Sequence, residues 1–137
     1  MQEVLNATEV RQNWGGFIDG VVRSRPEFVR RNRDFFAALS LDHLSAVLSP
    51  YLFHLEAAQE ADGSFSGSLR EIDLVANAPT LEELKSALAG ELVEYANEYM
   101  QEFDTYSRAP NRKGHLPYVL HVLIQRDTAA VAALIDV

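Results

Sequence analysis

The side chains best suited to binding an anion lie in the first third of the chain, around a short polar break at residues 32–34. A guanidinium fork can bind a phosphate or the edge of guanine, and an amide side chain can bind adenine. We expect three of these residues at the start of the first helix and three at the tip of a hairpin. The candidate nucleic-acid contacts are Arg11, Gln12, Asn13, Arg30, Arg31 and Arg33. The alternative is a solvated hairpin edge, whose charges prevent aggregation.

Charge is distributed unevenly between the two parts of the chain. The formal net charge of −8 argues against nucleic-acid binding if the chain is taken as a whole. However, residues 1–50 carry six basic and six acidic side chains, whereas residues 51–137 carry six basic and fourteen acidic ones. The neutral segment with clustered arginines is compatible with DNA binding, and the acidic segment that follows it is compatible with a different function.

Composition excludes several classes of protein. A 137-residue chain with 47% apolar residues can bury a core in one domain or two small ones. It has no cysteine, so disulfides and thiolate metal sites are excluded. We find no apolar run that could span a bilayer and no signal-peptide pattern, and we therefore expect a cytoplasmic location without membrane contact.

The first fifty residues predict four elements that would position the candidate arginines. Residues 1–5 form a short strand, and Thr8 caps a helix that ends before Pro26. Residues 27–31 and 35–39 are β-rich runs around the polar break and predict a hairpin. Ser40 then caps a second helix over residues 41–49. Trp14, the only tryptophan, is expected to pack in the core or between two copies of the chain.

This order resembles the Phd/YefM family of bacterial antitoxins. The resemblance is carried by residues 6–14, residues 26–33 and residues 38–40, and covers about a third of the chain. It implies a homodimer that binds operator DNA, represses its own operon and neutralises a partner toxin through the segment that follows. The turn at residues 32–34 departs from the family, in which it is often basic and contains glycine, because Asp34 offsets part of its positive charge.

The remainder of the chain predicts a small antiparallel sheet, a long helix and two short helices. Strands are expected at residues 52–58, 64–69 and 70–78, with Asp62-Gly63 in a hairpin turn. Thr80 caps a helix that extends to about Ser107. Short helices follow at residues 115–125 and from Asp127 or Thr128 to residue 135. Residues 61–65, 71–72 and 78–83 also resemble, weakly, the HicB antitoxin fold.

Together these patterns predict an α+β protein of two parts. Residues 1–50 form a DNA-binding and dimerisation module, and residues 51–137 form a sheet-plus-helix unit that is a candidate toxin-binding region. The candidate toxin contacts, which share one face of the long helix, are Glu91, Glu94, Glu98 and Glu102. The resemblance implies a basic ribonuclease as one kind of toxin for this acidic face. The alternatives are a solvated face, a divalent-cation site, or a unit that only completes the core.

No residue pattern predicts an enzyme. The four histidines lack ligand spacing, and the serines have neither a nucleophile-elbow motif nor an obvious base. We therefore expect no catalytic residue, no cofactor and no metal. The rival hypothesis is a stand-alone protein-interaction or scaffold domain that has lost DNA binding, and a small hydrolase is a third class.

Overall fold

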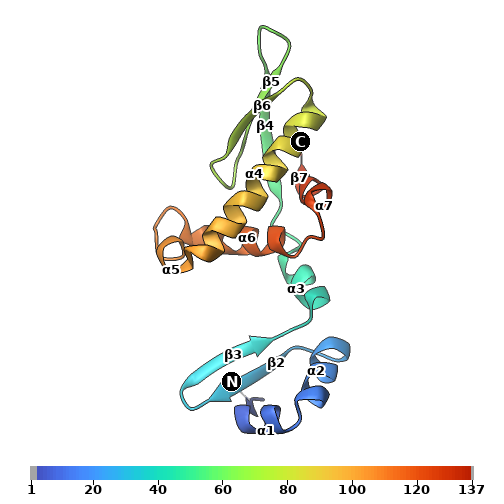
Figure 1. Ribbon diagram of the computed structural model, residues 1–137, viewed down its shortest axis with the longest axis vertical. Helices are drawn as coiled ribbons and strands as arrows, with labels where there is room; N and C mark the ends of the chain where they lie inside the picture. The colour runs from blue at the N-terminus through green and yellow to red at the C-terminus, as the bar shows by residue number, and fades with distance from the viewer. Residues whose placement is uncertain (1–2, 137) are drawn as a thin grey trace. The chain divides into compact units, whose positions relative to one another are not determined.

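The computed structural model of the protein describes residues 3–136, which divide into two compact units (Figure 1). Unit 1 extends to residue 47, and unit 2 begins at residue 48. The division lies within the last turn of helix α3 (Leu41–Leu48). Each unit has its own sheet.

Unit 1 contains a three-stranded sheet and two helices that precede the hairpin. Besides most of α3, its elements are β1 (Leu5–Asn6), α1 (Ala7–Gln12), α2 (Trp14–Arg23), β2 (Glu27–Arg31) and β3 (Asp34–Ala38). β1 pairs in parallel with β2, and β2 pairs antiparallel with β3. Of the strand predicted at residues 1–5, the first two residues lie outside the described part, and the observed strand begins only at Leu5.

The first helix begins and ends differently from the prediction. The N-cap is Asn6 and not Thr8, because the Asn6 Oδ1 atom accepts a hydrogen bond of 2.8 Å from the backbone N–H of Thr8. The predicted single helix is also two helices, because Asn13 leaves the helical conformation at φ −129° and ψ 55°. A Cβ on Gly16 would lie 2.5 Å from the Asn13 side chain, so a larger residue there would require that side chain to move.

The predicted hairpin is confirmed, with a tighter turn than expected. Arg31 pairs with Asp34 at its end, so the turn is formed by Asn32 and Arg33 alone. Asn32 adopts a positive φ of 55°, which asparagine tolerates better than most residues. The Ser40 cap of α3 is also confirmed, since its Oγ accepts a hydrogen bond of 3.1 Å from the backbone N–H of His43.

Unit 2 is a four-stranded sheet in the order β6-β5-β4-β7. The strands are β4 (Phe53–Gln59), β5 (Phe65–Leu69), β6 (Val75–Ala78) and β7 (Ile135–Asp136). The prediction of a purely antiparallel sheet was wrong, because β7 pairs in parallel with β4. The last helix, α7 (Thr128–Ala132), therefore ends three residues before its predicted limit, and Ile135 is buried beside Phe53 in the sheet.

The third predicted strand begins five residues late. Residues 70–74 form a tight turn in which the Leu74 N–H donates to Ile72 O at 2.7 Å and the Leu69 N–H donates to Leu74 O at 3.2 Å. This turn places the Ile72 side chain in the core, where it is 2% exposed. Ile72 therefore reaches the core from a turn, although the sequence around it has the pattern of a strand.

Helix α4 (Leu81–Gln101) provides the centre of the unit 2 core. Its predicted cap is confirmed, because the Thr80 Oγ1 atom accepts a hydrogen bond of 3.1 Å from the Glu83 N–H. The predicted continuation to Ser107 is interrupted at Glu102, which separates α4 from α5 (Phe103–Tyr106). A short 3-10 turn, η1 (Lys113–His115), precedes α6 (Leu116–Leu123). The Asp127 carboxylate caps α7 by accepting from the Ala130 N–H at 2.8 Å.

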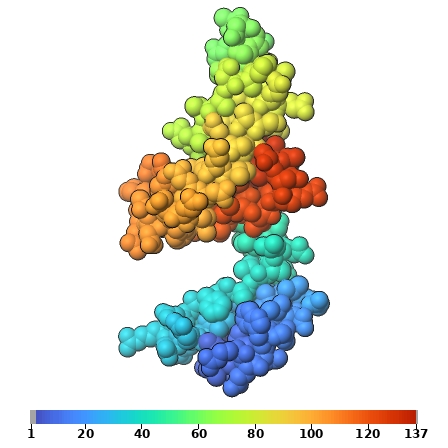
Figure 2. All heavy atoms as spheres, in the orientation of Figure 1, coloured from blue at the N-terminus to red at the C-terminus, as the bar shows by residue number. Residues whose placement is uncertain are grey.

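One side of α4 packs on the sheet and on α6 and α7, and the other side forms part of the surface of unit 2 (Figure 2). The side chains that are at most 1% exposed in this core are Phe53, Leu84, Leu88, Ala89, Leu92, Ala96, Tyr99 and Val119. No helix in residues 3–136 is both long and apolar enough to cross a membrane.

Candidate nucleic-acid and partner-binding surfaces

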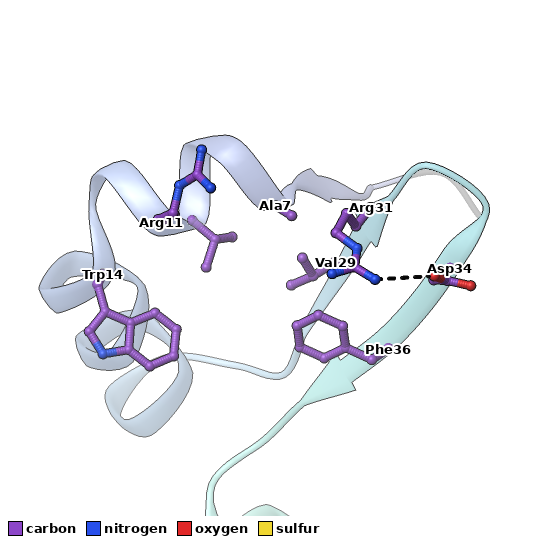
Figure 3. A pocket seen from close by; sticks show the side chains of 8 residues that line it. Ala7, Arg11, Trp14, Val29, Arg31, Asp34 and Phe36 are labelled. Atoms are coloured by element: carbon purple, nitrogen blue, oxygen red, sulfur yellow. Dashed lines mark ion pairs between the residues drawn. The ribbon is translucent and has the colours of Figure 1, made fainter.

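Unit 1 contains an apolar hollow of about 550 Å³ between its helices and one face of its sheet (Figure 3). Trp14 of α2 and Phe36 of β3 lie on opposite sides of the hollow, and Val29 of β2 lies beside Phe36, its partner on the neighbouring strand. Trp14 is 57% exposed and Phe36 is 54% exposed, although both face apolar neighbours. Trp14 is therefore not buried within its own chain, and it stacks on Phe17 with 5.5 Å between ring centroids.

The apolar surface of unit 1 extends beyond the hollow. Among the described residues of this unit, only Val10, Val21 and Val29 are buried apolar side chains, and only Val29 is at most 1% exposed. Its other exposed large apolar side chains are Ile18, Val22, Phe28, Phe35, Leu41 and Val47. They do not form one patch, since Phe28 and Phe35 lie on the face of the hairpin opposite the hollow. The apolar surface around the hollow is the part most typical of a protein–protein interface.

The three hairpin arginines do not share one face. Arg31 lies on the side of the hollow and forms an ion pair of 3.5 Å with Asp34 (Figure 3). Arg30 lies on the opposite face, as strand alternation requires. There its Nε donates to Asn32 O at 2.8 Å, and its guanidinium carbon lies 5.8 Å from the centroid of the Phe35 ring. Arg33 is exposed in the turn.

The polar residues predicted for the start of the first helix lie at its end. The helix begins at Ala7, so Arg11 and Gln12 occupy its last turn and Asn13 follows it. The prediction was wrong because the cap is two residues earlier than Thr8. The three residues are exposed, and the Arg11 guanidinium points away from the hollow in Figure 3. A basic side chain in the last turn also interacts favourably with the helix dipole.

Half of the arginines in unit 1 are paired with carboxylates. Arg23 binds Asp19 at 2.8 Å, and Arg25 binds Glu3 at 2.8 Å and Glu27 at 3.4 Å. The hydrogen bond to Glu27, followed by the one to Glu3, raises the pKa of Arg25. Within residues 3–136, the arginines of this unit that have no carboxylate within ion-pair distance are Arg11, Arg30 and Arg33.

In unit 2 the four predicted glutamates are exposed, and the helical period places them along one face of α4 and its C-terminal cap. Glu98 accepts a hydrogen bond of 2.6 Å from the Tyr106 hydroxyl, which is the main reason for the raised pKa of that tyrosine. Among the described residues, no group of three or more His, Cys, Asp or Glu side chains has the arrangement of a metal site. The face is therefore acidic, solvated and held in place by a regular helix.

The histidines of unit 2 take part in hydrogen bonds inside the unit. His54 pairs with Glu71 at 2.5 Å, and buried His121 donates to Tyr51 O at 2.7 Å. His115 Nδ1 and the Tyr95 hydroxyl share a hydrogen bond of 2.6 Å.

Arg112, whose guanidinium carbon lies 4.3 Å from the centroid of the Tyr106 ring, was not predicted from the sequence. The regular spacing of Tyr95, Tyr99 and Tyr106 was visible, but it does not reveal that residues 107–112 fold back onto them.

Comparison with known proteins found one matching family profile and a similar crystal structure. A family profile described as "PHD_like: Antitoxin of toxin-antitoxin, RelE / RelB, TA system" matches residues 1–137. A crystal structure from Syntrophomonas wolfei subsp. wolfei, described as an antitoxin part of a toxin/antitoxin system, has a TM-score of 0.94 and 38% sequence identity. The match covers 98% of this chain and 97% of that one. No curated protein matches the chain with significance.

Proposed function

The chain belongs to the PHD-like family of toxin–antitoxin antitoxins, and from this premise we propose how it acts. It forms a homodimer through unit 1, binds operator DNA with the arginines of that unit, and represses its own operon in the cytoplasm. Unit 1 has the Phd/YefM arrangement that its element order suggests. Unit 2 neutralises the partner toxin through the acidic face of α4.

The apolar surface of unit 1 supports the homodimer. Trp14 and Phe36 are each more than half exposed on either side of a hollow whose wall is mainly aliphatic and aromatic. A second copy of the same face would cover these side chains and supply the core that unit 1 lacks. Symmetric pairing of one patch with itself is the commonest way in which soluble chains associate.

The observation that carries the DNA-binding proposal is the set of guanidiniums without carboxylate partners. Arg30 is also held toward the turn by its bond to Asn32 O, so its side chain is ordered before any ligand arrives. Three such arginines per copy give about six phosphate contacts per dimer, for which affinity falls about 10³-fold between about 50 and 200 mM salt.

Binding to the DNA upstream of its own gene, followed by fluorescence anisotropy at several salt concentrations, tests this proposal. Replacing Arg30 and Arg33 together by Ala is expected to weaken binding strongly. The slope of log affinity against log salt concentration should become less steep, by the equivalent of about four phosphate contacts per dimer. Arg23→Ala is the matched control, since Arg23 is an exposed arginine of the same unit already paired with Asp19. Equal effects of the two changes would contradict the assignment of these arginines.

The acidic face supports the toxin-binding role. Glu91, Glu94, Glu98 and Glu102 present four negative charges along α4 and its cap without basic partners among the described residues. Such a face suits a basic partner, for example a basic ribonuclease. Charge reversal of Glu91 and Glu94 to Lys is expected to slow association with the product of the adjacent reading frame, and the effect should fade as salt is raised. Unchanged association at low salt would contradict it.

One observation favours a second candidate function, a scaffold domain without DNA binding. Asp34 neutralises Arg31 at the tip of the hairpin, and Arg30 lies on the opposite face, so the positive charge is not gathered on one surface. Under this hypothesis the chain would dimerise and bind its protein partner normally. The absence of any mobility shift with upstream DNA at low salt would favour it.

A further inference from the structure

Unit 2 contains a polar pocket of about 490 Å³ that the proposed roles do not use. It lies between the tight turn at residues 70–74, Tyr95 of α4 and the segment 111–115. Its walls combine aliphatic side chains of the turn with the polar groups of Arg112 and His115. We call this cavity the Arg112 pocket.

Arg112 is held in place from two directions. The Tyr99 hydroxyl, which belongs to a residue with no exposed surface, donates to the Arg112 backbone oxygen at 3.1 Å. The guanidinium carbon lies 4.3 Å from the centroid of the Tyr106 ring and 5.7 Å from that of Tyr95. Within residues 3–136 no carboxylate lies within ion-pair distance of this group. Arg112 is therefore a half-buried cation, ordered by aromatic rings and without a counter-ion.

His115 provides a second donor beside this cation. Burial and, next, the Arg112 charge lower the pKa of His115, and burial raises the pKa of Tyr95. Near neutral pH the imidazole is therefore uncharged and the tyrosine keeps its proton. We assign the donor role in the 2.6 Å hydrogen bond between the Tyr95 hydroxyl and His115 Nδ1 to the hydroxyl, which leaves the ring proton on Nε2. A guanidinium fork and an imidazole N–H in one pocket match the oxygens of an anion.

The other side chains of the pocket favour a carboxylate over a phosphate. Glu71 and Asp73 also line it, and their charges would repel a doubly charged phosphate more than a singly charged carboxylate. Arg112 is also close to the acidic face of α4, because the ring of Tyr106 lies under its guanidinium and the hydroxyl of Tyr106 donates to Glu98. A protein lying on the acidic face would reach Arg112 at the edge of the contact.

We propose that the Arg112 pocket receives an Asp or Glu side chain of the toxin bound to the acidic face of α4. This inference rests on the proposed toxin-binding role of unit 2. One acidic anchor beside an otherwise basic contact fixes orientation, because a toxin turned around would place a cation against Arg112.

The first experiment measures the affinity of the full chain for the product of the adjacent reading frame by calorimetry. Arg112→Gln is expected to weaken binding about ten-fold or more, since it leaves the toxin carboxylate without its partner. The backbone oxygen that Tyr99 binds remains in this variant. The matched control is Arg108→Gln, which removes an equal charge from an exposed position in the preceding loop and should change affinity less than about three-fold.

The second experiment uses small probes on the full chain without toxin. N-acetyl-glutamate amide, which carries one carboxylate, is expected to shift the Arg112 Nε–H and His115 ring NMR signals in a saturable manner, and Arg112→Gln should abolish the His115 shift. Inorganic phosphate should bind more weakly than this probe. Tighter binding of phosphate, or no saturable shift with the capped glutamate, would overturn the proposal.

The outcomes separate the inference from the function on which it rests. If the wild-type chain does not bind the product of the adjacent reading frame, the toxin-binding role fails and the inference fails with it. If the wild-type chain binds, and Arg112→Gln and Arg108→Gln behave alike, the inference alone is wrong and the toxin-binding role stands.

Discussion

Replacing Phe36 by Ala should dissociate the proposed homodimer. Phe36 is 54% exposed in the single chain. An aromatic side chain offers about 150–250 Å² for burial, so about 100 Å² remains for a second copy to cover. At about 25 cal/mol per Å² this surface is worth about 2.5 kcal/mol, of which the alanine methyl group keeps a small part. A symmetric dimer loses the difference twice, about 4 kcal/mol, which raises the dissociation constant about 10³-fold.

Sedimentation velocity over a range of protein concentrations measures this constant directly. Val75→Ala is the matched control, because Val75 is 66% exposed but lies on the edge strand of the unit 2 sheet. Far-ultraviolet circular dichroism should be unchanged in both variants, since neither side chain is buried in its own chain. A wild-type chain that sediments as a monomer at every concentration, or a Phe36→Ala variant that dimerises as well as Val75→Ala, would refute the reasoning.

Three further predictions concern single side chains. Gly67→Ala should lower the free energy of unfolding by about 1–3 kcal/mol in urea denaturation, because its Cβ would lie 2.8 Å from two core leucine carbons. Gly90→Ala should raise the free energy of unfolding by about 1 kcal/mol, because the space around this position of α4 is open. Because the pKa of His115 is lowered in the folded chain, this imidazole takes up a proton at a higher pH in the unfolded chain, about 6.5, than in the folded one. The unfolding free energy should therefore decline below that pH, by less than about 1.4 kcal/mol per pH unit, and His115→Gln should reduce this decline. Asp34→Asn should strengthen DNA binding up to about five-fold at low salt by freeing Arg31, whereas a weakened complex would show that the ion pair itself is needed.

Local chemistry in the sequence predicted the elements that depend on neighbouring residues. The hairpin around Asn32 and the caps at Ser40, Thr80 and Asp127 were confirmed, because a side-chain oxygen satisfies a helix N–H whatever the rest of the fold does. The long apolar stripe of α4 was predicted for a similar reason, since a period of three to four residues is visible without knowledge of its partner.

Two of the failures concern features that distant residues decide, whereas the cap at Asn6 and the helix break at Asn13 are local features that the prediction missed. β7 exists only because Ile135 meets Phe53, far away in the sequence, and two residues carry no strand pattern of their own. The strand expected from Arg70 gave way to a turn because burying Ile72 in the core outweighed continued pairing.

The candidate site was predicted by residue type but not by geometry. The sequence identified the hairpin arginines, and strand alternation already placed Arg30 and Arg31 on opposite faces. The ion pair that occupies Arg31, and the aromatic stacking that orders Arg112, depend on contacts that only the folded chain provides.

Native mass spectrometry of the chain mixed with its upstream DNA is the most direct test of the central claim, that two copies of unit 1 join to hold DNA. We expect the wild-type complex to contain two chains per duplex, or a multiple of two, and Phe36→Ala to leave the duplex free at the same concentration. A complex with a single chain per duplex, or no complex at low salt, would contradict the account.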